Sequence, residues 1–304
     1  MPHFRYVHLD VFTDCPFEGN QLAVFPEPRG LSPEQMQTMT REMNFSECTF
    51  ILPPESTGDV RMRIFTPGNE LPMAGHPTIG STFALAAEGV IARGREDFVF
   101  ELGIGPTPVS LEWAQDGLRF VWMTQPLPTF GATVADHASL AAAVGLEAKD
   151  LLPNLPIQVV SCGVPFLFVP IATRAAVDSV AIDRKALARC GRDAGLEDLG
   201  ELFLFTTDRE GSAGDETVYS RMLAPAFGIG EDPATGAASG PLGCYLLHYG
   251  VVSDEAVRAL VSLQGVAMRR PSRIHISIDT RERTISRVRV GGQSVIVGSG
   301  ELRF

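Results

Sequence analysis

Apolar and polar residues alternate along much of the chain, as they do in strands that bury one face. The pattern predicts strands at 5–12, 22–27, 48–53, 59–66, 98–113, 117–125, 156–172, 201–207, 216–223, 273–280 and 285–304. Helical spacing predicts helices from Ser32 to about 43, near 136–145, at 183–194 and near 253–263. The first start is the clearest, because Ser32, Pro33 and Gln35 match an N-cap, a first-turn proline and a capping box. The mixture predicts an α+β protein.

Two further helical segments carry almost no charge. Between Pro77 and Val90 only Glu88 is ionised, and between Gly236 and Val251 only His248 has an acidic or basic side chain. A helix that is apolar all round is buried all round. Because alternating strands flank both segments, we expect each helix to lie at the centre of a curved sheet that wraps it. A helix sandwiched between ordinary layers is the alternative.

The same two segments begin in similar sequence. Residues 68–91 align without a gap with residues 229–252, so that Glu70 matches Glu231 and Gly75 matches Gly236. The similarity extends upstream, where RIFTP at 63–67 is echoed by RMLAP at 221–225. This pattern indicates an internal duplication, and a duplication predicts two similar lobes that face each other across a cleft.

Length and a proline-rich joint place these lobes on the chain. A chain of 304 residues is long enough for two cores of roughly 150 residues each. QPLP at 125–128 separates the two repeats. We therefore expect lobes at 1–118 and 127–290, with the last strand, about 292–304, as a candidate to return to the first lobe.

Charge and cysteine content limit the classes of binding partner and the cellular compartment that we expect. A net charge of -11 disfavours nucleic acid and anionic membrane surfaces, although the dipoles of helix termini still allow a small anionic substrate. The five cysteines are scattered without a CxxC pair, which favours reduced thiols. The N-terminus lacks the apolar stretch of a signal peptide, and no uncharged apolar run reaches about 18 residues. We expect a cytoplasmic protein.

Each of the two apolar helices begins in a glycine-rich turn, 74–78 and 234–239. The free N–H groups of a helix start and the positive end of its dipole suit a carboxylate or an enolate, whereas tight packing alone also explains such glycines. For His76, which enters a helix at a turn, a functional role and a purely structural role are equally compatible with its position. Asp232 before Pro233 matches an ordinary N-cap, and Glu47, between a helix and a strand, matches a solvated loop carboxylate.

Several motifs, in this order, resemble the PhzF-type family of phenazine-biosynthesis isomerase-like proteins. They are DVFT at 10–13, PFEGN at 16–20, LAV at 22–24, EMNFSECTF at 42–50, AGHPT at 74–78 and GEDPATG at 230–236. The resemblance runs from near the N-terminus to past residue 250. It implies the diaminopimelate epimerase-like fold, in which two pseudo-equivalent lobes each wrap a curved, mostly antiparallel sheet around a central buried helix.

The resemblance also implies which residues are catalytic and which bind the substrate. Glu47 is similar to the glutamate that shuttles a proton between carbons of the phenazine precursor, with His76 and Asp232 assisting it. Burial would raise the pKa of such a carboxyl toward the working range of a general acid/base. The implied enzyme uses no cofactor or metal. The implied substrate-binding residues are Asn20, Ser46, Gly75, Pro77, Thr78, Thr235, Gly236 and Ala237.

This chain differs from related proteins in two respects that bear on its reaction. Where epimerases and proline racemases of this fold carry a cysteine at each helix turn, this chain carries Ala74 and Thr235, so a two-thiol inversion is not available. Ala237 replaces a serine of the phenazine enzyme, which puts the phenazine substrate itself in question.

We therefore expect an isomerase that acts on a small cyclic or unsaturated carboxylate. A non-catalytic binding protein with the same cleft is the alternative, and an amino-acid epimerase ranks third. The family and the apolar stretch 164–170 also lead us to expect a homodimer.

Overall fold

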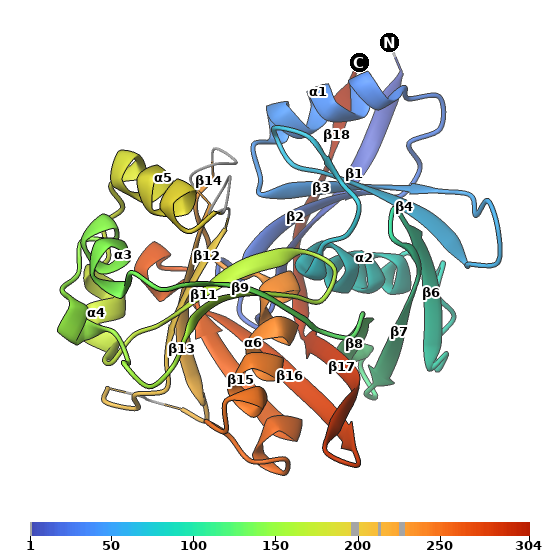
Figure 1. Cartoon of the computed structure of the whole chain (residues 1–304). Coiled ribbons are helices and arrows are strands. Elements are labelled where there is room, and N and C mark those ends of the chain that lie inside the picture. The colour runs from blue at the N-terminus through green and yellow to red at the C-terminus, as the bar shows by residue number, and fades with distance from the viewer. Residues whose placement is uncertain (1, 196–200, 212–213, 225–228) are drawn as a thin grey trace.

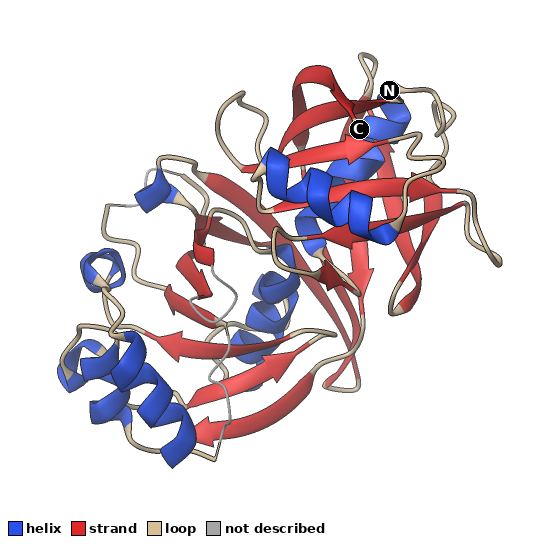
Figure 2. Ribbon diagram, turned by 90° about the horizontal axis from the view of Figure 1, so that it is seen from above, coloured by secondary structure: helices blue, strands red, loops and turns tan. Residues whose placement is uncertain are grey.

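The computed structural model describes residues 2–195, 201–211, 214–224 and 229–304. The chain forms two lobes, and each wraps a curved sheet around one helix (Figures 1 and 2). The strands of the N-terminal lobe are β1 (His3–Val11), β2 (Asn20–Phe25), β3 (Glu47–Leu52), β4 (Val60–Phe65), β5 (Glu70–Leu71), β6 (Asp97–Leu102), β7 (Gly105–Trp113), β8 (Leu118–Gln125) and β18 (Ser294–Arg303). Its helices are α1 (Pro33–Met43) and α2 (Gly75–Ala87).

The C-terminal lobe has the corresponding set. Its strands are β9 (Thr129–Val134), β10 (Ile157–Ser161), β11 (Pro165–Pro170), β12 (Leu202–Thr206), β13 (Val218–Ala224), β14 (Ile229–Asp232), β15 (Leu260–Gln264), β16 (Ser272–Arg281) and β17 (Thr284–Gly292). Its α-helices are α3 (His137–Ala143), α4 (Arg174–Ser179), α5 (Arg184–Asp193) and α6 (Gly236–His248). Short 3₁₀ turns lie at Ala148–Asp150, Ala256–Ala259 and Val266–Met268.

Strand pairing follows one order in both lobes. In the first, β1–β2 is antiparallel, β2–β3 parallel, β3–β4 antiparallel, β4–β6 parallel, and β6–β7–β8 antiparallel. In the second, β10, β11, β12, β13, β15, β16 and β17 repeat these steps with the same directions. This repetition confirms the two pseudo-equivalent lobes.

The lobes are joined by strand pairing and by exchanged strands. β8 pairs with β17, so one continuous sheet runs through both lobes. β9 follows β8 in the chain but pairs with β10, and β18 follows β17 but pairs with β1. The C-terminus therefore lies beside the N-terminus, where the Phe304 N–H donates to the Pro2 carbonyl at 3.2 Å (Figure 1).

The two central helices are buried as their composition predicts. Each has 13 residues, and every residue of α2 from Gly75 to Leu85 and of α6 from Gly236 to Leu246 is buried. An uncharged helix can be surrounded by apolar sheet faces without leaving an ionised side chain stranded. None of the helices in the described part of the chain is long and apolar enough to span a membrane.

A matching ion pair precedes each central helix. Arg63 of β4 donates to both carboxylate oxygens of Glu70, at 2.7 and 2.6 Å. Arg221 of β13 does the same to Glu231, at 2.9 and 2.8 Å. These are the residues that the repeat aligns. We call each two-bond ion pair an Arg–Glu clamp, because it holds the short strand that leads to each helix turn.

Local predictions succeeded unequally. The capping box of α1 is confirmed, because the Gln35 N–H donates to Ser32 Oγ and the Ser32 N–H donates to Gln35 Oε1. The helix predicted near 253–263 is wrong. That segment is the 3₁₀ turn Ala256–Ala259 followed by β15, which lies between β13 and β16, so pairing to two neighbours overrides its helical propensity. The pattern also did not predict β9, α4 or the short strands β5 and β14.

The apolar stretch that suggested a dimer surface has another role. β11 pairs on one side with β10 and on the other with β12, and Phe166, Leu167, Phe168 and Val169 are buried within the lobe. This stretch therefore gives no support to the predicted homodimer.

Candidate active site

The N-termini of α2 and α6 meet at the junction of the lobes. A Cβ atom built on Gly75 would lie 2.6 Å from the Cα of Gly236, and one on Gly236 would lie 3.1 Å from the Cα of Gly75. Only glycine allows this approach of two backbones. The N-cap residues Ala74 and Thr235 make no side-chain cap, so neither cap side chain competes with a ligand for the N–H groups of the first turns.

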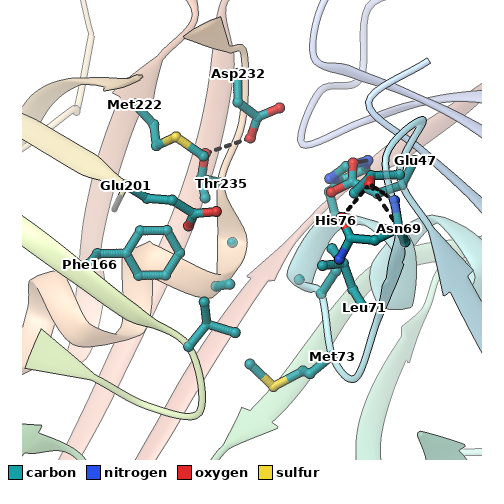
Figure 3. A pocket seen from close by; sticks show the side chains of 16 residues that line it. Glu47, Asn69, Leu71, Met73, His76, Phe166, Glu201, Met222, Asp232 and Thr235 are labelled. Carbon is teal, nitrogen blue, oxygen red and sulfur yellow. Dashed lines mark hydrogen bonds and ion pairs between the residues drawn. The ribbon is translucent and has the colours of Figure 1, made fainter. Parts of the chain in front are cut away.

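A pocket that is partly open to solvent lies against these two turns (Figure 3). Both lobes contribute side chains, which include Glu47, Asn69, Leu71, Met73, His76, Val164, Phe166, Glu201, Met222, Asp232 and Thr235. Its mostly apolar lining with a few polar groups is typical of a site for a small molecule.

Glu47 is the first residue of β3 and not a solvated loop residue. Its side chain is 13% exposed, and its Oε2 lies 3.3 Å from His76 Nε2. Within the described residues, neither atom has a hydrogen-bond partner of acceptable geometry. Burial, reinforced by the charges of Asp232 and Glu201, raises the pKa of Glu47 well above its usual range.

His76 enters the pocket from the second position of α2 and is 3% exposed. Burial lowers its pKa to about 3, so the imidazole is neutral at physiological pH. The amide nitrogen of Asn20 lies 3.2 Å from His76 Nδ1. That amide nitrogen also donates to Asp232 Oδ1 at 2.7 Å and to the Ala234 carbonyl at 3.1 Å, so it belongs to a network that joins His76 to the other lobe.

Asp232 ends β14 and does not cap α6, which begins only at Gly236 with Thr235 as its N-cap. The Asp232 carboxylate accepts hydrogen bonds from Asn20 Nδ2 at 2.7 Å, Thr235 Oγ1 at 2.5 Å and Ser46 Oγ at 3.3 Å. Burial raises its pKa to about 6, against the opposing effect of these hydrogen bonds. Since Asn20 and Ser46 belong to the other lobe, this carboxylate links the two halves.

The predicted site residues fall into three groups. Seven line the pocket: Glu47, Gly75, His76, Asp232, Thr235, Gly236 and Ala237. Asn20 and Ser46 reach the site through Asp232. Pro77 and Thr78 lie within α2 and do not line the pocket, and the Thr78 hydroxyl donates to the Ala74 carbonyl at 2.8 Å.

Sequence reasoning missed Glu201, which lies directly before β12. Cys48 of β3 and Leu202 of β12 pair with residues of β4 and β13 that the repeat aligns. Glu47 and Glu201 precede them, so the two glutamates occupy equivalent positions in the two lobes. The chain between the paired strands is longer in the second lobe, so an ungapped extension of the repeat does not reach Glu201, and only the strand registers reveal the match.

Comparison with solved structures defines the class of protein. The chain superposes on a hydroxyproline epimerase from Agrobacterium vitis with a TM-score of 0.66 over 99% of this chain and 92% of that one, at 12% identity. It superposes on a PhzF-family phenazine biosynthesis protein from Bacillus anthracis with a TM-score of 0.88 over the full length of both, at 25% identity. The fold is therefore the diaminopimelate epimerase-like α+β fold.

Sequence comparison then gives the family. The model of the PhzC-PhzF family, phenazine biosynthesis-like proteins, matches residues 9–300. A trans-2,3-dihydro-3-hydroxyanthranilate isomerase from Pseudomonas aeruginosa is 36% identical over 97% of this chain and 98% of its own length. The chain belongs to the PhzC-PhzF family and is an isomerase.

Proposed function

We propose that this isomerase moves a proton between two carbons of a small cyclic or unsaturated carboxylate without a cofactor, and that Glu47 is its single acid/base. The observation that carries the proposal is the Glu47 carboxyl, which lies in a pocket between two lobes beside a neutral His76. Its raised pKa suits a group that must both take and return a proton near neutral pH.

The substrate carboxylate would lie at the turns where α2 and α6 begin, because their N–H groups favour negative charge. The ionised Glu47 then takes a proton from carbon. The electron pair of the broken C–H bond delocalises into the neighbouring unsaturated system, and the same backbone N–H groups stabilise the negative charge that develops there. Glu47 returns the proton to a second carbon, so no group is consumed.

His76 and Asp232 would position the substrate. The Nε2–H of a neutral imidazole can donate a hydrogen bond to substrate oxygen without adding a full charge beside Glu47. Asp232, held by Asn20, Ser46 and Thr235, presents an acceptor from the opposite lobe. No cysteine lines the pocket among the described residues, which argues against the two-thiol route of epimerases of this fold.

The test uses deuterated water. Trans-2,3-dihydro-3-hydroxyanthranilate, the substrate named for the relatives, and a panel of unsaturated carboxylates are incubated with the enzyme, and NMR follows deuterium at carbon. We expect incorporation with at least one of them, whereas a protein that only binds would catalyse none. Glu47→Gln should lower the exchange rate by about 100- to 10,000-fold. The control is Glu96→Gln, which alters an exposed carboxylate.

Exchange by Glu47→Gln as fast as by the parent would remove Glu47 from the mechanism. Absence of exchange with every carboxylate would favour the non-catalytic alternative. We further propose, on family grounds alone, that the protein is a cytoplasmic homodimer. Light scattering that shows a monomer at micromolar concentration would count against the dimer.

A further inference from the structure

Gln264, the last residue of β15, is fully buried and bonds to the turn that carries Asp232. Its Oε1 accepts the backbone N–H of Thr235 at 3.1 Å, and its Nε2 donates to the backbone carbonyl of Asp232 at 2.8 Å. Because a backbone N–H only donates and a carbonyl only accepts, these two bonds fix the orientation of the Gln264 amide. The side chain therefore bridges both ends of the turn from Asp232 to Thr235.

The third bond of Gln264 sets the direction of a hydroxyl proton. The second Nε2 proton donates to Thr235 Oγ1 at 2.9 Å. Thr235 Oγ1 in turn donates its own proton to Asp232 Oδ2 at 2.5 Å (Figure 3). A chain of donors therefore runs from Gln264 through Thr235 to the Asp232 carboxylate, and each bond in such a chain polarises the next one.

Strand register identifies the residue of the first lobe that corresponds to Gln264. β6 and β15 pair with β4 and β13 through residues that the repeat makes equivalent, among them Val60 and Val218. In this register Leu102, the last residue of β6, corresponds to Gln264, the last residue of β15. Leu102 is 7% exposed, so both positions are buried. The scaffold of the first lobe therefore accommodates a leucine where the second lobe has a glutamine.

All three members of this chain of donors have apolar counterparts in the first lobe. The corresponding residues, by the repeat and by strand register, are Leu71, Ala74 and Leu102. A buried polar network destabilises a protein unless every member is bonded, whereas apolar side chains fill the same positions of the first lobe without that risk. The scaffold therefore does not require the network, which points to a role in the pocket that Asp232 and Thr235 line.

We propose that Gln264 is a positioning residue of the active site, which holds the turn from Asp232 to Thr235 and directs the Thr235 hydroxyl proton to the Asp232 carboxylate. The inference rests on the proposed function, because that function makes Asp232 an acceptor for the substrate. Asp232 Oδ2 is then bonded from its own lobe, while Oδ1 is bonded by Asn20 and Ser46 of the other lobe. Gln264 does not line the pocket and acts on the substrate only through Thr235 and Asp232.

The experiment follows the pKa of Asp232 by NMR, because a hydrogen bond donated to a carboxylate lowers its pKa. Burial raises this pKa to about 6 in the parent, and the Thr235 hydroxyl is the largest of the hydrogen-bond effects that oppose burial. Protein labelled with ¹³C at the aspartate carboxyls is titrated, and Asp232→Asn identifies the signal. Glu47, Glu201 and Glu231 also interact with this carboxyl through their charges, and they stay unchanged in every variant.

Gln264→Leu introduces the residue that the first lobe has at this position. It should raise the pKa of Asp232 by roughly 0.5 to 1, which corresponds to the net contribution of one hydrogen bond. Thr235→Val should also raise it, and the two changes should not add in the double variant, because both interrupt the same chain of donors. The control is Gln158→Leu, which removes side-chain hydrogen bonds of another buried glutamine outside the pocket. It should lower stability and leave the pKa of Asp232 unchanged.

A measurement on the parent decides the question if Gln264→Leu does not fold. The side-chain ¹⁵N–H signals of Gln264 should shift with a midpoint at the pKa of Asp232, and Thr235→Val should abolish this response. A response that is absent from the parent, or that survives in Thr235→Val, would overturn the proposal.

Three results from the variants would overturn it as well. They are an unchanged pKa of Asp232 in Gln264→Leu, additive shifts in the double variant, and an equal shift in Gln158→Leu. The proposed isomerisation fails separately, because the NMR titration needs no substrate. If the pKa of Asp232 depends on Gln264 while no carboxylate exchanges deuterium, the positioning network stands and the Glu47 mechanism does not.

Discussion

The two lobes share a scaffold but not a chemistry. Both have the same order of strand pairing, a buried 13-residue helix, an Arg–Glu clamp and a glutamate at the start of equivalent strands. The differences lie at the turns, where His76 of the first lobe corresponds to Ala237 of the second, and Leu71 of the first corresponds to Asp232 of the second. A few substitutions on a duplicated frame therefore give the two walls of the pocket different side chains.

The largest expected effect distinguishes the two glutamates. Glu47→Gln should lower kcat by about 100- to 10,000-fold with KM little changed, because amide and carboxyl have the same shape but only the carboxyl carries a proton. Glu201→Gln should lower kcat far less, because this carboxyl enters the pocket from the other lobe and is not the proposed acid/base. Steady-state kinetics on both variants measures the split. Similar losses of kcat in both variants would contradict the claim that the two glutamates have different roles.

The next effect compares the two Arg–Glu clamps. The side chains of Arg221 and Glu231 are 11% and 15% exposed, and those of Arg63 and Glu70 are 16% and 41% exposed. Arg221→Met leaves a carboxylate buried without its partner and should lower the free energy of unfolding by about 3–5 kcal/mol. Arg63→Met should cost about 1 kcal/mol. Urea unfolding of the two variants gives both values, and equal losses would contradict this reading.

A smaller effect concerns the contact between the lobes. Gly75→Ala places a Cβ atom 2.6 Å from backbone of the other lobe, so the helix turns must move apart. We expect a loss of about 1–3 kcal/mol of unfolding free energy, as for other overpacked sites. Gly298→Ala serves as the control, because its Cβ would meet no atom within 4 Å. If Gly75→Ala is as stable as that control, the two turns do not need to touch.

The smallest effect is the pH dependence of folding stability that His76 causes. Ala237, the corresponding residue of the second lobe, has no titratable group and cannot contribute to it. Its pKa is about 3 in the folded protein, below the ordinary unfolded value of about 6.5. The unfolded chain therefore takes up a proton first as pH falls, and folding stability declines between about pH 6.5 and pH 3.

Replacing His76 by Gln removes this contribution. From pH 7 to pH 5 the parent should lose about 1–2 kcal/mol more stability than His76→Gln. The comparison of variants cancels the opposite contributions of the buried carboxyls. Identical slopes for the parent and His76→Gln would show that His76 titrates normally.

The candidate site could be predicted in part. The glycine-rich turns and His76 were visible in the sequence, because local spacing marks where a helix begins and which side chain enters it. Motif resemblance was needed to single out Glu47. On local pattern alone Glu47 was a solvated loop residue and Asp232 an N-cap, and both interpretations were wrong. Glu201 was missed because it is a lone glutamate until the strand registers of the two lobes are known.

The sequence by itself determined the two buried helices, the capped start of α1 and the duplication, since each depends on composition or spacing within a short stretch of chain. Tertiary structure decided that residues 260–264 form a strand, that Glu47 is largely shielded from solvent, and that Asn20 bonds to Asp232. The physical reason is distance along the chain. Strand pairing and burial depend on which distant segments come together, and the pKa of a carboxyl depends on the water and charges that those segments remove or supply.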